Sequence, residues 1–295
     1  MKLSIKIIIF FLFIIAVFHS CTKDPAINKT NNLNGNIISA FGHAGMGLEF
    51  KYPIDSYESI EPCLRIGSDG TEMDIQMTKD SVLIVYHDSY LEEGTLCKGM
   101  INDLLWPDIW GCHRTSPISS KINLSSFRDM MKELTADGYD ISKFTFTFDC
   151  KLYTHNIDYN TFLNQYANAI INAIHEFHLE NNLLIESQDT TLLHILQKKK
   201  KGLKLFIYPP NFNEGFRVAK AMNLFGITIH TKSISEEQVK FAHDNGLRIT
   251  LWGIDTQQAN IEAAAKSPDY MQSDKIIPLL KMFGKYKYNI NKPNK

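Results

Sequence analysis

The chain lacks several features that would point to a particular partner or chemistry. Its 31 basic and 32 acidic residues leave a formal net charge of −1, which gives no support for a nucleic-acid or polyanion partner. Its five cysteines form no pair of C-x2-C sites, so their spacing matches no zinc-binding pattern. No G-x-G-x-x-G turn opens a predicted helix, which disfavours a dinucleotide-binding open sheet.

The N-terminus has the pattern of an export signal. Lys2 and Lys6 precede an uncharged run, Ile7–Phe18, which is short for a membrane-spanning helix of about 20 residues. A basic start, a short apolar run and a small residue describe a signal peptide. Cys21 follows and resembles the lipid-modified cysteine of bacterial lipoproteins; the alternative is an ordinary secretory signal with an incidental cysteine. We therefore expect an exported, membrane-anchored lipoprotein, in the periplasm or at the cell surface.

The rest of the chain divides into three parts. Residues 22–36, rich in Asn and without apolar periodicity, are predicted to be a flexible tether. Residues 37–282 are predicted to form one catalytic domain of a usual size for a (β/α)8 barrel. Residues 283–295 form a polar tail.

Short apolar runs alternate with longer amphipathic stretches within this domain. The predicted strands are Ile37–Gly42, Thr71–Met77, Phe144–Asp149, Leu183–Glu186, Leu203–Tyr208, Gly226–His230, Arg248–Trp252 and Asp269–Gln272. The predicted helices are Ser56–Ile66, Ser125–Ala136, Tyr159–Phe177, Thr190–Lys200, Glu214–Met222, Ser235–Asn245 and Gln257–Lys266. Alternation implies parallel strands, and about eight repeats favour closure into an α/β TIM barrel over a doubly wound open sheet.

One connection breaks the alternation. Only four residues separate Thr71–Met77 from the run Val82–His87, too few for a parallel crossover, so we expect an antiparallel hairpin. A turn centred on residues 79–80 places His87 opposite Glu72. Side chains alternate along a strand, so the predicted register puts this imidazole on the face that carries the strand's carboxylates.

Acidic residues stand where predicted strands end. Glu72 and Asp74 lie on the second strand, and Asp149 ends the third. The carboxyl ends of barrel strands build the active site, and carboxylates are the oxygen ligands that Ca2+ or Mg2+ takes. Structural zinc, in contrast, favours Cys and His. We predict one Ca2+ or Mg2+ held by these three residues.

Two histidines and a lysine complete the candidate chemistry. His43 and His87 end separate strands, and imidazoles titrate near neutral pH, so they are candidates for general base and general acid. Lys151 offers a point charge to a phosphate. Trp252 either lines the pocket as an apolar wall or fills the barrel mouth. Any one of these residues alone would more often be structural, so the hypothesis depends on their combination.

The order of the motifs resembles the glycerophosphodiester phosphodiesterase family. That family's signature reads His-Arg-Gly, Pro-Glu-Asn-Thr, Gly-Ala-Asp-Gly, Glu-x-Asp, Thr-Lys-Asp-Gly and His-Asp. The corresponding segments here are His43-Ala44-Gly45, Pro53-Ile54-Asp55-Ser56, Gly67-Ser68-Asp69-Gly70, Glu72-Met73-Asp74, Thr78-Lys79-Asp80-Ser81 and His87-Asp88. Downstream, the matches are Asp149-Cys150-Lys151, Ile185-Glu186-Ser187, Leu251-Trp252 and Gln272-Ser273-Asp274.

The resemblance covers roughly residues 37–280 in matching order. It implies metal-dependent hydrolysis of a glycerophosphodiester to an alcohol and glycerol 3-phosphate, with His43 and His87 as the catalytic pair. It also implies metal ligation by the three acids named above and a phosphate contact by Lys151. The substrate would be a small molecule, and the membrane would be contacted through the lipid anchor.

The departures from the signature bear on activity. Ala44 replaces an arginine that contacts phosphate, Ile54 replaces a glutamate, and Asp55 replaces an asparagine. A guanidinium is one of the stronger oxyanion contacts, so either another cation replaces it, the substrate is positioned differently or activity is reduced. Arg114 is a conceivable substitute. Asp149 is shorter than the family's glutamate.

The cysteines after the signal divide into a candidate pair and buried thiols. Cys97 and Cys112 flank one loop-like stretch and form the pair that could be a disulfide. Cys150 falls in an apolar strand, where a buried free thiol is expected.

Two other functions stay open at this level. One is a phospholipase-like phosphodiesterase with a different headgroup, or with internal attack through a cyclic phosphate. The other is a surface-binding protein on a barrel that has lost catalysis.

Overall fold

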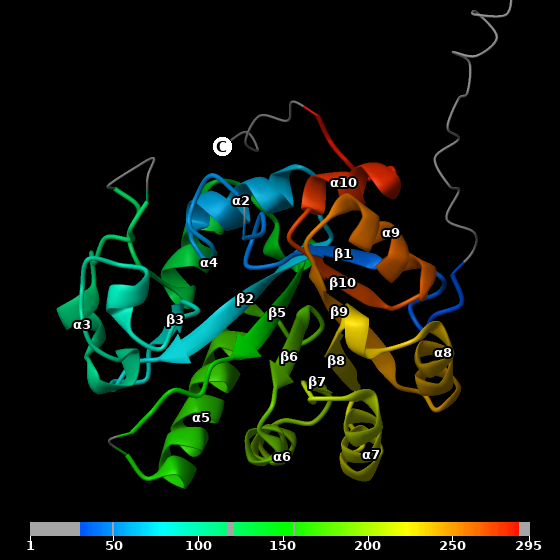
Figure 1. Cartoon of the computed structure of the whole chain (residues 1–295). Helices are drawn as coiled ribbons and strands as arrows, with labels where there is room; N and C mark the ends of the chain where they lie inside the picture. The colour runs from blue at the N-terminus through cyan, green and yellow to red at the C-terminus, as the bar shows by residue number, and fades with distance from the viewer. Residues whose placement is uncertain (1–29, 49, 117–120, 156, 289–295) are drawn as a thin grey trace, which may run out of the picture.

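The computed structural model describes residues 30–48, 50–116, 121–155 and 157–288, which form a barrel of parallel strands surrounded by helices (Figure 1). The first strand pairs with both the last and the second, which closes the barrel. In order around it the strands are β1 (Ser39–Gly42), β2 (Gly70–Met77), β5 (Thr145–Cys150), β6 (Leu183–Ser187), β7 (Lys204–Ile207), β8 (Gly226–His230), β9 (Arg248–Ile254) and β10 (Tyr270–Ser273). The predicted (β/α)8 fold is confirmed.

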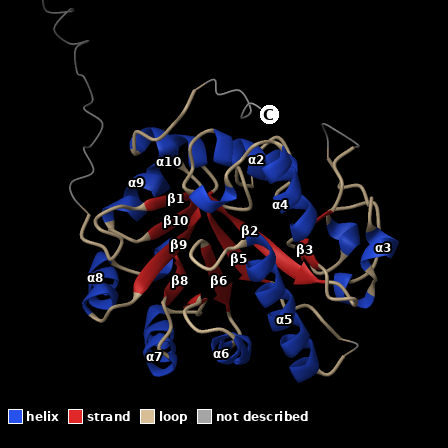
Figure 2. Cartoon of the chain, turned by 180° about the vertical axis from the view of Figure 1, so that it is seen from behind, coloured by secondary structure: helices blue, strands red, loops and turns tan. Residues whose placement is uncertain are grey.

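Helices surround the barrel on its outside (Figure 2). They are α2 (Tyr57–Arg65), α4 (Phe127–Ala136), α5 (Tyr159–Phe177), α6 (Thr190–Lys199), α7 (Phe212–Met222), α8 (Glu236–Asp244), α9 (Gln257–Ala265) and α10 (Ile276–Met282). Side-chain caps set several of their starts, because they satisfy backbone N–H groups that have no partner within the helix. Asp158 accepts from the N–H of Thr161 at the start of α5, and Ser235 forms a capping box with Gln238 at the start of α8.

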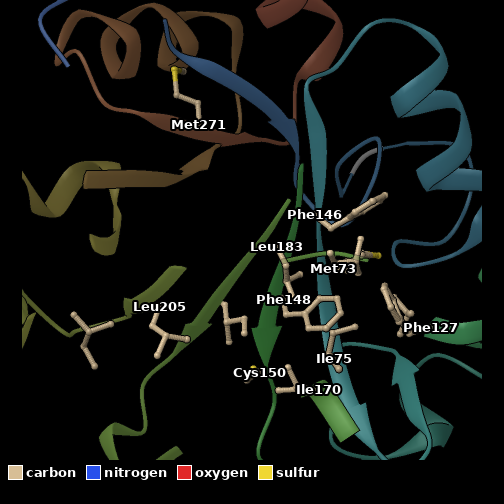
Figure 3. Close-up of a cluster of buried hydrophobic side chains, with 14 of the residues drawn as sticks. Met73, Ile75, Phe127, Phe146, Phe148, Cys150, Ile170, Leu183, Leu205 and Met271 are labelled. Carbon is tan, nitrogen blue, oxygen red and sulfur yellow. The ribbon is translucent and has the colours of Figure 1, made fainter. Parts of the chain in front are cut away.

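Apolar side chains fill two different spaces. The larger core lies between the strands and the surrounding helices, and Figure 3 shows Met73, Ile75 and Phe148 in this cluster together with Phe127 and Ile170. Inside the barrel, a smaller cluster gathers side chains from four strands, namely Phe41, Leu184, Phe206 and Tyr270. A TIM barrel is a packed core rather than a pore, so this cluster fills the interior on the side where the strands begin.

The predicted hairpin is present, with a different register. β3 (Leu83–Val85) pairs antiparallel with β2, and Ile75 lies opposite Val85. The predicted register is therefore wrong by one residue. Ser81 adopts a left-handed conformation at φ 66°, and the Thr78 N–H bonds the carbonyl of Val82. A three-residue hairpin loop with a left-handed residue of this kind shifts the pairing by one position relative to a two-residue turn.

An insertion follows the hairpin and covers one side of the barrel. It contains the short elements η1 (Leu91–Glu93), η2 (Ile101–Asp103), α3 (Trp106–Ile109) and β4 (Ser125–Ser126), the last of which pairs with β3. Its own apolar cluster packs on Ile84 and Tyr86. The predicted disulfide between Cys97 and Cys112 is present in this insertion, and Cys150 is a buried free thiol, as expected.

The chain ends pack on the face where the strands begin. Residues 30–36 belong to the predicted tether, yet Asn32 donates to the carbonyls of Ile37 and Pro268, and Arg248 donates to Asn34. This part of the tether is therefore docked. Asn side chains hydrogen-bond backbone groups in docked segments and are also common in flexible linkers. An Asn-rich composition therefore does not distinguish a docked segment from a flexible tether. In the predicted polar tail, Lys285 forms an ion pair with Asp69 at 2.6 Å.

The predicted signal peptide and Cys21 lie outside the described residues. Within the described part of the chain, no helix has the length and apolar character that crossing a membrane requires.

Candidate active site

Three carboxylates meet at the end of the barrel where the strands finish. Glu72 and Asp74 stand on β2, and Asp149 stands on the adjacent β5, where it pairs in register with Asp74. Their ligand atoms all lie within 4.8 Å of one another. Glu72 and Asp74 are buried, and Asp149 is partly exposed. The structure thus brings together all three predicted metal ligands.

This cluster holds acidic groups that repel one another. Burial, with the charges of Asp74 and Asp149, raises the pKa of Glu72 well above its usual value. One Glu72 oxygen accepts from the Ala44 N–H at 2.8 Å, whereas the other, Oε1, is buried and has no hydrogen-bond partner. A buried carboxylate oxygen without a partner costs free energy, so a ligand that satisfies it would be bound favourably.

The donor set fits a divalent cation. Hard carboxylate oxygens suit Ca2+ and Mg2+, and an oxygen of Glu72 is available to face an ion. Glu72, Asp74 and Asp149 are the residues that would hold it.

Lys151 lies against these acids. Its Nζ is 3.0 Å from Asp74 Oδ1 and 2.8 Å from Asp149 Oδ2. Burial would lower the pKa of Lys151, but the two carboxylate charges outweigh it and raise the pKa. Conversely, burial would raise the pKa of Asp74, and the charge of Lys151, followed by that of His87, lowers it overall. The predicted phosphate-binding lysine is thus at the site, in contact with the carboxylates.

His43 is held at the same rim. It follows β1, its Nδ1 lies 2.9 Å from Asp274 Oδ1, and its Nε2 lies 3.9 Å from Glu72 Oε2. Burial would lower the pKa of His43, but the hydrogen bond and charge of Asp274 raise it overall. The glycine of the motif is required by packing, because a Cβ on Gly45, at φ 96°, would lie 2.5 Å from the Ser59 hydroxyl.

His87 lies beyond the end of β3 and is about half exposed, with 48% of its side chain accessible. Its Nδ1 is 2.8 Å from Asp88 Oδ1. The backbone N–H of Tyr86, the residue before His87, donates to the carbonyl of Asp74 at 2.9 Å. Both predicted imidazoles therefore flank the carboxylate cluster, although the shifted hairpin register does not place His87 opposite Glu72.

Arg114 does not take the place of the missing arginine. It is only 4% exposed, and its guanidinium donates to the carbonyls of Ile54, Asp55 and Val85 at 2.8, 3.0 and 2.5 Å. These bonds tie the insertion to the loop after β1. Its two terminal nitrogens therefore bond backbone carbonyls and its Nε is buried, so these contacts do not support the suggestion that Arg114 substitutes for the family's arginine, which Ala44 replaces.

An aromatic wall stands elsewhere on the rim. The Trp252 ring packs edge-on against Tyr208 at 5.3 Å and against His230 at 4.7 Å. A Cβ built on Gly253, which has φ 74°, would lie 2.3 Å from the His230 ring, so this position has no room for a side chain. The Trp252 indole nitrogen is buried and has no hydrogen-bond partner. The sequence analysis did not predict that His230 lies at this rim. Its position at the end of a barrel strand is the feature that could have indicated it.

Sequence reasoning also assigned no role to two acids. Asp274 follows β10 and orients His43, a contact between residues 231 apart in the chain. Glu186 on β6 is 1% exposed, and Gln272 reaches it from β10 at 3.0 and 3.1 Å. Burial raises the pKa of Glu186 to about 8. Closure of the barrel predicts that residues far apart in the sequence meet across it, but it does not predict which side chains contact each other.

Residues 46–276 match the sequence profile of the glycerophosphoryl diester phosphodiesterase family. The chain belongs to this family. A glycerophosphodiester phosphodiesterase of Caldanaerobacter subterraneus subsp. tengcongensis is 23% identical over 212 residues, which cover 70% of this chain and 82% of the relative. A shorter match to the glycerophosphodiester phosphodiesterase of Bacillus altitudinis is 36% identical over 66 residues, 22% of this chain and 27% of that protein.

Solved structures of this family share the fold. A putative glycerophosphodiester phosphodiesterase from Galdieria sulphuraria superposes with a TM-score of 0.70 at 16% identity, covering 84% of this chain and 98% of that one. A phosphodiesterase from Oleispira antarctica, in complex with the product sn-glycerol-3-phosphate, gives a TM-score of 0.71 at 12% identity and covers 83% of this chain and 96% of its own.

Proposed function

We propose that the chain is a metal-dependent glycerophosphodiester phosphodiesterase that releases an alcohol and glycerol 3-phosphate. The observation that carries the proposal is the meeting of Glu72, Asp74 and Asp149 with His43 and His87 at one barrel rim. Membership in the family supports the reaction class. The substrate is then a small phosphodiester.

The three acids are proposed to hold Ca2+ or Mg2+. Such an ion, when bound, neutralises charge on the phosphate oxygens and orients the diester. This proposal is supported by β2 and β5, which are adjacent and in register and so bring the three carboxylates together. Lys151, already beside two of these carboxylates, carries a flexible ammonium that can turn to a phosphate oxygen on the same side.

The two histidines are proposed to move protons on opposite sides of the phosphorus. Asp274 accepts a hydrogen bond from His43 Nδ1, which leaves Nε2 directed to the site near Glu72. Asp88 holds His87 in the same way through Nδ1. One imidazole takes a proton from the attacking water, and the other gives a proton to the leaving alcohol oxygen. The carboxylate partners fix the ring orientation that both transfers need.

The test is hydrolysis of a panel of glycerophosphodiesters by the full mature protein, with Ca2+, Mg2+ or a chelator present. We expect cation-dependent release of glycerol 3-phosphate and at least about a 100-fold loss of kcat/KM for His43→Ala, since general acid–base catalysis contributes 10²- to 10⁴-fold. His194→Ala, on the exposed face of α6, is the matched control and should retain wild-type rates. Equal rates for His43→Ala and wild type would reject the assignment.

Product analysis in the same assay separates two routes. Direct attack by water gives glycerol 3-phosphate first, whereas attack by a substrate hydroxyl gives a cyclic phosphate first. The second route is the alternative that Ala44, in place of a phosphate-contacting arginine, keeps open. A panel that is inactive with every cation would favour a surface-binding protein instead.

The cellular location is a separate proposal, supported by the sequence alone. We propose export of the chain and lipidation at Cys21, with residues 22–29 linking the anchor to the docked segment that begins at residue 30. Incorporation of labelled palmitate should be lost in Cys21→Ser, and the protein should move from the membrane to the soluble fraction. Membrane association that does not depend on this cysteine would refute it.

A further inference from the structure

A pocket of about 290 Å³ opens beside the catalytic rim, and His87 forms part of its wall. Its other walls come from two segments that lie outside the barrel strands. Phe50, Tyr52 and Ile54 belong to the loop after β1, and Arg114 belongs to the insertion that carries the disulfide. The pocket therefore continues the active site on the His87 side.

Arg114 makes this pocket a fixed structure. Its guanidinium bonds the carbonyls of Ile54 and Asp55 on one side and that of Val85 on the other. It therefore joins the loop after β1 to Val85 at the end of β3, two residues before His87. Ligand pockets are usually largely pre-formed, and these bonds hold two walls of this pocket together without a ligand.

The charges around the pocket disfavour a cation inside it. Three aromatic rings, those of Phe50, Tyr52 and Tyr86, line the pocket and could hold a quaternary ammonium group through cation–π contacts. Two of them already have a cation of the protein nearby, because Lys51 Nζ lies 5.5 Å from the Tyr52 ring centre and the Arg114 guanidinium lies 5.3 Å from that of Tyr86. Asp88, a carboxylate of the pocket wall, is paired with His87.

The position of His87 indicates which part of a diester would enter. A general acid must lie within hydrogen-bond reach of the leaving oxygen. The alcohol attached to that oxygen then extends away from the carboxylate cluster, on the side of the acid. His87 joins the cluster to this pocket: the N–H of Tyr86, directly before it, donates to the Asp74 carbonyl at 2.9 Å, and His87 itself lines the pocket.

We propose that this pocket binds the leaving alcohol of the substrate and that it selects neutral or anionic alcohols, such as polyols, over choline and ethanolamine. The inference rests on the proposed phosphodiesterase function and assigns His87 as the general acid. Ile54 supplies an apolar surface to the alcohol, and Lys51 supplies the positive charge at the pocket wall.

The experiment compares kcat/KM for the glycerol, inositol, ethanolamine and choline esters of sn-glycerol 3-phosphate. The wild-type protein should prefer the two polyol esters by roughly tenfold or more, as expected for a repelled cation in a partly screened site. Ile54→Glu and Lys51→Glu should each shift this ratio toward choline by about tenfold, because they place a carboxylate at the pocket. Inhibition by glycerol 3-phosphate, which lacks the alcohol, should stay within twofold of wild type.

Two controls keep the test specific. Lys79→Glu makes the same charge change at an exposed hairpin turn and should not alter the ratio. Glu49→Gln, at a residue outside the described part of the chain, removes the acidic charge two positions before Lys51 in the sequence. The proposal is overturned if the pocket variants change all four esters equally, or if Glu49→Gln rather than Lys51→Glu alters the ratio.

Calorimetry with the His43→Ala protein separates the pocket from the reaction. This variant should bind the glycerol ester more tightly than the choline ester, and Lys51→Glu in the same background should remove the difference. If no ester is hydrolysed but this binding preference holds, the proposed reaction fails and the pocket stands. Equal binding of both esters, with hydrolysis intact in the wild type, rejects the pocket alone.

Discussion

The two ends of the barrel each contain a histidine–aspartate pair, and the pairs have different surroundings. His43 lies 2.9 Å from Asp274 where the strands finish, and His243 lies 2.8 Å from Asp269 where they begin. At the second end, Asp269 also accepts from the backbone N–H groups of Leu33 and Ile249. The same two residue types therefore form a contact in the candidate active site at one end and a fully hydrogen-bonded structural contact at the other.

The carboxylates near each pair explain the difference. Asp269 is fully buried and both of its oxygens accept hydrogen bonds. Near His43, in contrast, Oε1 of Glu72 is buried and has no hydrogen-bond partner. The negative charges of Asp74 and Asp149 act on the Glu72 carboxylate. Fully satisfied buried polar groups stabilise a fold, whereas unsatisfied ones oppose folding and are kept where a ligand uses them. One end should therefore lose function when it is altered, and the other should lose stability.

Glu72→Gln gives the largest expected effect. The amide removes one charge from the proposed ligand set, so we expect kcat/KM to fall by roughly 100-fold or more, because a bound metal supplies several kcal/mol of transition-state stabilisation. Cation affinity measured by calorimetry should fall as well. In cation-free buffer the melting temperature should stay level or rise, since repulsion with Asp74 and Asp149 is relieved. A clear loss of stability in that buffer would contradict the inference that the Glu72 carboxylate opposes folding.

Asp269→Asn should produce the opposite pattern. The amide cannot accept from three donors as the carboxylate does, and breaking a buried pair costs about 3 kcal/mol of unfolding free energy. Urea denaturation should detect this loss, and the segment 30–36 should become sensitive to protease because Leu33 loses its partner. Below the melting temperature kcat/KM should remain within twofold of wild type. A tenfold loss of activity in the folded variant would show that the two ends are coupled.

Asp274→Asn probes the active-site pair itself. The hydrogen bond and charge of Asp274 raise the pKa of His43, so the variant should move the corresponding limb of the pH–rate profile to lower pH. Misorientation of the ring should lower kcat by roughly 10- to 100-fold, as for other residues that orient a functional histidine. KM should change little, because Asp274 lies behind the imidazole. An unchanged profile would mean that Asp274 only packs against His43.

The sequence predicts the strand order and the acidic cluster because both follow local rules. Alternating apolar runs give parallel strands, and strand-end acids on neighbouring strands must meet. Helix α5 has the predicted bounds, Tyr159–Phe177. The hairpin register was wrong because one left-handed residue, Ser81, is not visible in an apolar pattern. Contacts across the closed barrel, such as that between Asp274 and His43, depend on side-chain placement that no local pattern contains.

Glu186 lies inside the barrel, between the two ends, and tests whether a buried carboxyl group there stabilises the fold or opposes folding. Its pKa is raised from an ordinary 4.5 to about 8 by burial, so between these values the folded chain retains a proton that the unfolded chain has released. Stability from this group is fully present below pH 4.5 and is lost as the pH rises through 8. Glu186→Gln keeps an oxygen for the Gln272 amide and removes the titration. At pH 9 it should therefore raise the unfolding free energy by at least about 1.4 kcal/mol relative to its effect at pH 5, the equivalent of one pKa unit. Urea titrations at both values measure this difference, and equal effects would show that the Glu186 carboxyl titrates alike in the folded and unfolded chains.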